Sequence, residues 1–219
     1  MDSLQFAQEC LGVWLTPQEL AGGAGAPLID KETWQRCATS TPPQGTPSAY
    51  AVKFSVDGIY FAVCVAIKDG DSTHVELVDK RATIGGKQAL AEFVTKRAQT
   101  VPVIIDGKAG AESLYRRVID SVPEDNVTIP AAADLITANV DFVDAVNEGS
   151  ITWFKPDSLD DSEEDELTKA VTESYKRPIG RTGGWGFDGE RAAVVEAATL
   201  AAWAAKQYED DEDEGEVFF

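Results

Sequence analysis

Catalytic chemistry in this chain would have to rest on carboxylates, because other reactive side chains are few and scattered. The single histidine, His74, lies far in sequence from the cysteines, and neither CxxC nor HxxxH spacing occurs. A zinc site and a histidine-based nucleophile are therefore disfavoured. Aspartate and glutamate together number 38, so the question is which acids the fold brings together.

The most distinctive acid is Asp106, which ends an apolar run in the stretch VPVIIDGKAG, residues 101–110. The Gly-Lys pair that follows suggests a phosphate loop, but such a loop needs the spacing G-x-x-x-x-G-K-[ST]. The leading glycine would fall at Pro102, and the other Gly-Lys pair, at 86–87, fails the same test. We therefore expect no ATPase site, and Asp106 is either a turn residue or a metal ligand at a strand end.

The pattern of apolar residues predicts the elements that must position Asp106. Alternation and short apolar runs predict five strands, at 50–56, 59–67, 73–79, 101–106 and 126–130. Helical spacing predicts helices at 85–99, 109–122, 131–149, 162–176 and 190–207, with a Gly-rich loop at 177–189. Right-handed crossovers place the last two strands parallel to the first. The expected fold is α/β: three antiparallel strands, then two parallel ones, with helices on both faces.

Composition divides the chain into three parts. Residues 1–47 read as a connector of short helices, the first over 1–20, and a Pro/Gly-rich linker; 48–208 read as the main domain, and 209–219 as an acidic tail. The net charge of −19 comes largely from two segments, 157–166 and 209–216, with seven acids each and no Lys or Arg. Without these fourteen acids the charge would be −5, so the body is only mildly acidic. Neither a signal peptide nor the ~18 apolar residues of a membrane span is expected.

The predicted topology favours a metal site at one edge of the sheet, because ligands gather at the carboxyl ends of parallel strands. Asp57 follows the first strand and Asp106 ends the fourth, while Asp188 or Glu190 precedes the last helix. Two divalent ions ~4 Å apart, held by such carboxylates, can activate water for phosphodiester cleavage. Each acid also has a simpler interpretation: the two Asp-Gly pairs as turns, and Asp188 or Glu190 as a helix cap.

Several segments resemble a known family. They are YAVKFSVDGIYFAVCVAI, HVELVDKR, VPVIIDGKAGAESL, KRPIGRTGGWGF and VVEAATLAAWAA, and together they span residues from about 48 to 206. This region resembles the C-terminal nuclease domain of the terminase large subunit of tailed bacteriophages, which has an RNase H-like fold. The leader FAQECLGVWL and the segment ETWQRCA are similar to the connector that follows the packaging ATPase domain in such proteins.

The resemblance implies a metal-dependent endonuclease that uses two Mg²⁺ or Mn²⁺ ions to cut concatemeric double-stranded DNA during genome packaging. The implied partners are double-stranded DNA, the terminase ATPase domain, the small terminase subunit and the portal protein. The implied location is the host cytoplasm, at the procapsid.

Carried over position by position, the resemblance makes Asp57, Asp106 and Asp188 the predicted catalytic metal ligands. Asp106 matches the second acid of the family, whereas Lys53 stands where the first acid is usual and Asp57 is the nearest substitute. The usual position of the third acid holds Arg191 and Ala192, so Asp188, Glu190 or Glu196 must replace it. Candidate DNA phosphate contacts are Lys53, Lys108, Lys176, Arg177 and Arg181.

Two hypotheses remain after this comparison. The favoured one is an active two-metal endonuclease, and the alternative is a catalytically degenerate RNase H-like domain that docks on the packaging motor or guides DNA. Lys53 and the displaced third acid favour the second hypothesis. A junction-resolving nuclease of the same fold is a third option, although such enzymes usually carry a more basic surface. Under either of the first two hypotheses, a net charge of −19 predicts weak, salt-sensitive DNA binding by the isolated chain.

Overall fold

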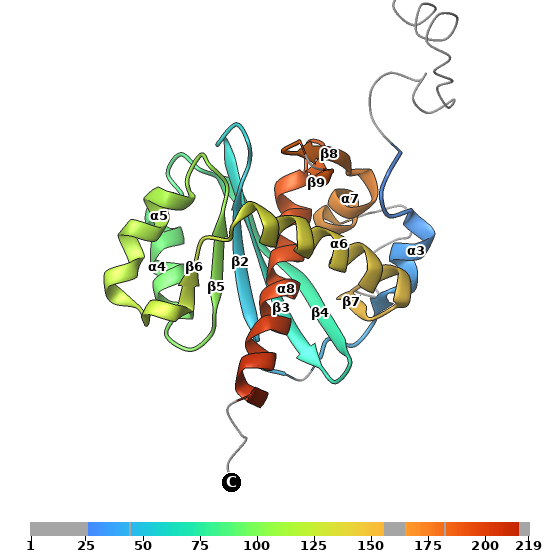
Figure 1. Ribbon diagram of the computed structural model, residues 1–219, viewed down its shortest axis with the longest axis horizontal. Helices are drawn as coiled ribbons and strands as arrows, with labels where there is room; N and C mark the ends of the chain where they lie inside the picture. The colour runs from blue at the N-terminus through green and yellow to red at the C-terminus, as the bar shows by residue number, and fades with distance from the viewer. Residues whose placement is uncertain (1–25, 44, 156–164, 182, 215–219) are drawn as a thin grey trace, which may run out of the picture.

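The computed structural model describes residues 26–43, 45–155, 165–181 and 183–214 (Figure 1). The helix predicted at 1–20 lies outside these residues, and so does most of the acid-rich segment 157–166. Within the described part of the chain, no helix is both long enough and apolar enough to cross a membrane.

A seven-stranded mixed sheet forms the centre of the fold, with the order β1-β7-β4-β3-β2-β5-β6. The strands are β1 (Ala38–Thr39), β2 (Ala49–Phe54), β3 (Tyr60–Asp69), β4 (Ser72–Ala82), β5 (Val103–Asp106), β6 (Val127–Thr128) and β7 (Ile151–Phe154). The β2–β3 and β3–β4 pairs are antiparallel, whereas β5 is parallel to both β2 and β6. These five strands confirm the predicted topology, and β7 and β1 extend the sheet beyond β4 through parallel pairs.

Helices cover both faces of the sheet (Figure 1). They are α3 (Lys31–Arg36), α4 (Lys87–Arg97), α5 (Ala111–Val118), α6 (Ala132–Glu148), α7 (Glu166–Glu173) and α8 (Ala192–Glu214), with short 3-10 turns at Ile119–Ser121 and Glu124–Asn126. One core cluster lies between α6, α8 and the sheet, and a second lies between α4, α5 and the opposite face. The class predicted from the sequence, an α/β fold with helices on both faces, is confirmed.

Successive side chains of the central strands point to opposite faces of the sheet, with small side chains on one face and larger ones on the other. Ala51, Ala62 and Cys64 belong to the cluster with α8, whereas Val52 and Phe61 belong to the cluster with α4 and α5. The buried face of α8 is itself rich in alanine. Small side chains on both surfaces let the helix backbone lie close to the sheet, where packing is dense. This close approach places α8 near the strand ends that carry the candidate site.

The Gly-rich segment 177–189 was predicted as a loop, and that prediction is wrong. It belongs mostly to an antiparallel hairpin of β8 (Tyr175–Ile179) and β9 (Gly184–Asp188). Gly180 and Gly183 have φ angles of 70° and 86°, which are strained for other residues, so glycine is needed to turn the chain. Five glycines within the segment conceal the alternating pattern that would otherwise predict strands.

Part of the segment assigned to a connector packs onto the main domain. Trp34 in α3 is fully buried, and its ring stacks on Trp153 of β7 at a centroid distance of 5.4 Å. Its indole Nε1–H donates to the Thr168 hydroxyl in α7 (3.1 Å), and the Trp153 indole donates to the Trp34 carbonyl (3.0 Å). Residues of α3 therefore share one core with the sheet. The domain boundary at residue 47, which was predicted from composition, stays a prediction.

Candidate functional site

The candidate site lies where the carboxyl ends of β2 and β5 approach the N-terminal part of α8. A cavity of about 470 Å³ opens there between the end of β2, the β2–β3 turn and the segment leading from β9 into α8. Its lining includes Lys53, Asp57, Arg177, Asp188, Glu190 and Glu196. The fold therefore brings most of the predicted site residues to one end of the sheet.

Lys53 and Asp106 sit side by side because β2 and β5 are parallel and pair in the register Lys53↔Asp106. The Lys53 ammonium donates a hydrogen bond to Asp106 Oδ2. Gly107, directly after Asp106, has a φ angle of 109°, and a Cβ there would meet the Phe54 carbonyl oxygen at 2.6 Å. Only glycine allows the chain to turn away this tightly, so the local sequence fixes Asp106 at the strand end.

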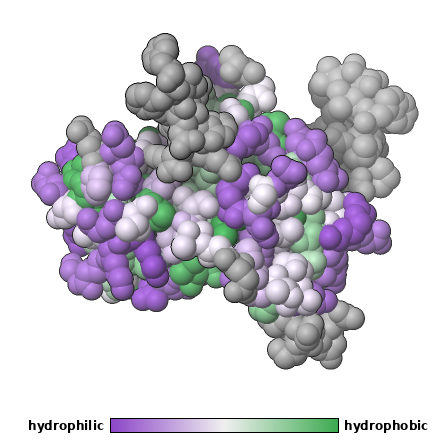
Figure 2. Space-filling model, turned by 90° about the horizontal axis from the view of Figure 1, so that it is seen from below, coloured by the Kyte–Doolittle hydropathy of each residue, from purple (hydrophilic) through white to green (hydrophobic). Residues whose placement is uncertain are grey.

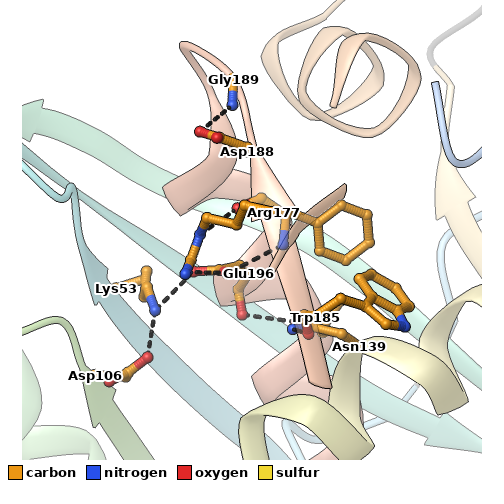
Figure 3. A network of polar contacts seen from close by, with 10 residues as sticks. Lys53, Asp106, Asn139, Arg177, Trp185, Asp188, Gly189 and Glu196 are labelled. Carbon is orange, nitrogen blue, oxygen red and sulfur yellow. Dashed lines mark hydrogen bonds and ion pairs between the residues drawn. The ribbon is translucent and has the colours of Figure 1, made fainter. Parts of the chain in front are cut away.

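Glu196 projects from α8 onto the same ammonium. Its Oε2 lies 2.7 Å from Lys53 Nζ, and the Lys53 and Glu196 side chains are only 6% and 2% exposed. Its Oε1 accepts from Arg177 Nη2 (2.9 Å) and from the Phe187 backbone N–H (3.2 Å). Arg177 also donates from Nε to the Phe187 carbonyl (2.8 Å). Figure 3 shows this chain of contacts running from β5 through β2 and α8 to the β8–β9 hairpin.

The Asp57 carboxylate accepts hydrogen bonds from residues of its own turn. It is exposed, and its Oδ1 accepts from the Ser55 hydroxyl (2.6 Å) and from the Ile59 N–H (3.0 Å). The Ser55 hydroxyl, and then the Ile59 amide, hold the pKa of this carboxyl below its usual value. These contacts are those of an Asx-type turn. The geometry of the Asp57-Gly58 pair is therefore that of an ordinary turn, which was the simpler of its two interpretations.

Asp188 is likewise engaged locally. Its Oδ1 accepts from the Gly189 N–H at 2.9 Å, at the point where β9 leads towards α8. Glu190 is exposed, and Arg191 Nη1 lies 3.7 Å from Glu190 Oε2. The Tyr60 hydroxyl donates to the Glu190 carbonyl (2.8 Å) and so ties this segment to β3.

The residues at the site do not fit a pair of divalent ions. Within the described ranges, no three or more His, Cys, Asp or Glu residues form a group that could hold a metal. Asp57, Asp106 and Asp188 are therefore not brought together as ligands, and their assignment stays a prediction. Asp106 and Glu196 do converge, but the cation between them is Lys53.

Glu196 is the residue that the sequence placed least securely, because it was only one of three substitutes for the third acid. The sequence does contain a signal for Glu196. Glu196 is the single acid in the apolar stretch AAVVEAATLAAWAA (192–205), which belongs to a helix predicted from the sequence. An isolated acid on a buried helix face needs a partner, and such a residue marks a structural or functional site.

The predicted DNA contacts divide into two groups. Lys53 is buried and Arg177 is partly buried, and both pair with Glu196. Lys108, Lys176 and Arg181 are exposed, and the Lys176 ammonium lies 4.7 Å from the centre of the Trp185 ring. The exposed group is the more accessible to solvent, and a role of any of these residues in DNA binding stays a prediction.

The architecture defines an RNase H-like α/β domain, and comparison with solved structures finds the same fold in terminases. The large terminase of bacteriophage HK97 superimposes with a TM-score of 0.54 at 11% sequence identity, over 82% of this chain and 43% of that one. A large terminase from a thermophilic bacteriophage gives 0.54 at 13% identity, over 92% and 48%. The predicted resemblance is thus confirmed at the level of the fold.

This chain spans less than half the length of each of these two large terminases. No protein-family profile matches its sequence, and no curated protein matches it. The likeness therefore concerns three-dimensional structure, at sequence identities too low to transfer individual site residues.

Proposed function

We propose that this chain is a nuclease-like domain of a DNA-packaging large terminase that docks within the motor and does not cut DNA by the two-metal route. One observation carries the proposal. The Lys53 ammonium is bound to both Asp106 and Glu196, the two acids that approach each other at the ends of β5 and α8.

The electrostatics of the cleft support this interpretation. Two-metal cleavage needs clustered carboxylates that are free to bind ions. Here a metal would have to displace Lys53, and the displaced ammonium would be left buried without the two carboxylates that pair with it, which is costly. The two cations that line the cleft, Lys53 and Arg177, both pair with Glu196, whereas Asp57, Asp188 and Glu190 line it as acids. Such a cleft repels DNA phosphates, so docking on protein components of the motor is favoured.

The endonuclease predicted from the sequence is the second candidate. It is favoured by the convergence of Asp106 and Glu196, which reach one point from β5 and α8. For this function Lys53 would have to move away, and a further acid would have to join the pair.

A plasmid-cleavage assay separates the two candidates. Supercoiled DNA is incubated with wild-type chain or with Asp106→Ala, in Mn²⁺ or in Mg²⁺. We expect no nicking above the buffer control with either protein. Cleavage by the wild type that Asp106→Ala abolishes would overturn the proposal, whereas equal cleavage by both proteins would indicate a contaminating nuclease. Docking is tested separately, by co-elution of the chain with the ATPase domain and with the portal protein encoded in the same genome.

A further inference from the structure

We infer that the Lys53 ammonium is a built-in counter-ion that makes the stability of this domain independent of divalent cations. We further infer that the single substitution Lys53→Asp exchanges this counter-ion for a divalent-cation site formed with Asp106 and Glu196. The inference goes beyond the proposed function, because it concerns how the fold is held together and does not depend on docking or on DNA.

The first support is the position of Lys53 in the fold. It joins three elements that are distant in sequence: β2, which carries it, β5 through Asp106, and α8 through Glu196. Figure 3 shows the lysine side chain lying between the two carboxylates. A single cation therefore holds the end of the sheet to the helix that covers it, and this is the structural effect that a bound metal ion would have.

The second support is the balance of charge. One chain of ion pairs joins two cations, Lys53 and Arg177, to two anions, Asp106 and Glu196. The formal charges of these four residues sum to zero, and removing one partner of such a pair is costly where the pair is buried. Arg177 also binds a backbone carbonyl, so the guanidinium is fixed to the β8–β9 hairpin and cannot replace Lys53. Without an ammonium at position 53, the cluster carries an uncompensated negative charge.

The third support is the chemistry that an aspartate at position 53 would create. Carboxylates at 53, 106 and 196, offset by Arg177, give a net charge of −2, which one divalent cation neutralises. Mn²⁺ and Mg²⁺ prefer oxygen ligands, and they accept water in the remaining positions. Position 53 already pairs in register with Asp106, so no change of strand pairing is needed.

Thermal unfolding without DNA tests this inference on the full chain. Four proteins are compared in EDTA and in MnCl₂: wild type, Lys53→Asp, Lys53→Asn as the matched neutral control, and Lys53→Asp combined with Glu196→Gln. We expect the wild-type Tm to be the same in EDTA and Mn²⁺. Lys53→Asp should have a lower Tm in EDTA, and this Tm should rise by about 5–10 °C at a Mn²⁺ concentration ~100-fold above the dissociation constant.

The control variants make the result specific. Lys53→Asn should lose stability without recovering in Mn²⁺, and the double variant should lose most of the recovery. Mn²⁺ binding to the wild type that depends on Asp106 would overturn the inference. A Lys53→Asp variant that stays unfolded or gains nothing in Mn²⁺ would also overturn it. The plasmid assay is a separate measurement, so a missing Mn²⁺ response leaves the proposed non-cleaving function standing.

Discussion

At the scale of single residues, two ion pairs of this molecule contrast sharply. Lys53 and Glu196 are almost fully buried, with their charged atoms 2.7 Å apart. Arg191 and Glu173 lie at a similar distance of 2.9 Å, but 55% of the Glu173 side chain is exposed. Solvent screens the second pair far more than the first, so the same chemical change should have very different effects at the two places.

We predict that Glu196→Gln lowers the free energy of unfolding by about 3 kcal/mol, because it leaves a buried ammonium and a guanidinium without their shared anion. The amide keeps nearly the same shape and can still accept from the Phe187 N–H. Glu173→Gln is the matched control, with an expected loss of at most ~1 kcal/mol. Urea denaturation measures both variants. Similar losses for the two would show that the Glu196 contacts contribute no more than a surface pair.

How far the sequence predicts this site depends on the range of each interaction. The place of Asp106 at a strand end was predictable, because it follows from a local pattern: a buried strand that meets a glycine. The turn at Asp57 was predictable for the same reason, since its hydrogen bonds join Ser55, Asp57 and Ile59, which are close in sequence. The pairing of Lys53 with Glu196 joins residues 196 − 53 = 143 positions apart. It depends on how closely α8 packs on the sheet, which no local pattern encodes.

At the scale of elements, α3 shows how a segment that reads as a linker can belong to the core. It has only 6 residues, and a helix this short is not stable by itself. Asp30 caps it by accepting from the Thr33 N–H (2.8 Å), and Trp34 buries its indole between Trp153, Phe142 and Thr168. The composition of residues 39–48, rich in Pro, Ser and Thr, predicted a boundary but could not report this long-range packing.

We predict that Trp34→Ala destabilises the whole domain by about 3–5 kcal/mol, because it leaves a cavity beside Trp153 and removes the indole hydrogen bond to Thr168. Trp34→Phe is the control: it keeps an aromatic ring and loses the hydrogen bond. Urea unfolding, followed by tryptophan fluorescence and by circular dichroism, gives both values. If residues 1–47 were an independent connector, Trp34→Ala would leave the unfolding transition of the sheet unchanged.

At the scale of the whole molecule, charge determines how the chain meets DNA. Figure 2 shows one face on which polar and charged residues predominate and apolar residues form small patches. The net charge is −19, and seven of the acids fall in residues 209–216. The exposed cations Lys108, Lys176 and Arg181 must act against this excess. The docking role proposed above is consistent with a surface that repels a polyanion.

We predict that the isolated chain binds DNA weakly, and that neutralising residues 209–216 strengthens this binding. Replacing the seven acids there by Asn and Gln changes the net charge from −19 to −12, which reduces repulsion of the phosphate backbone. Fluorescence anisotropy with a labelled duplex measures the affinity at about 50 mM and about 200 mM salt, where screening should narrow the difference between the two proteins. As a control, reversing Lys108 and Arg181 to Glu in the neutralised chain should remove the gain. Tight binding by the wild type at about 200 mM salt would contradict both the charge argument and a role limited to docking.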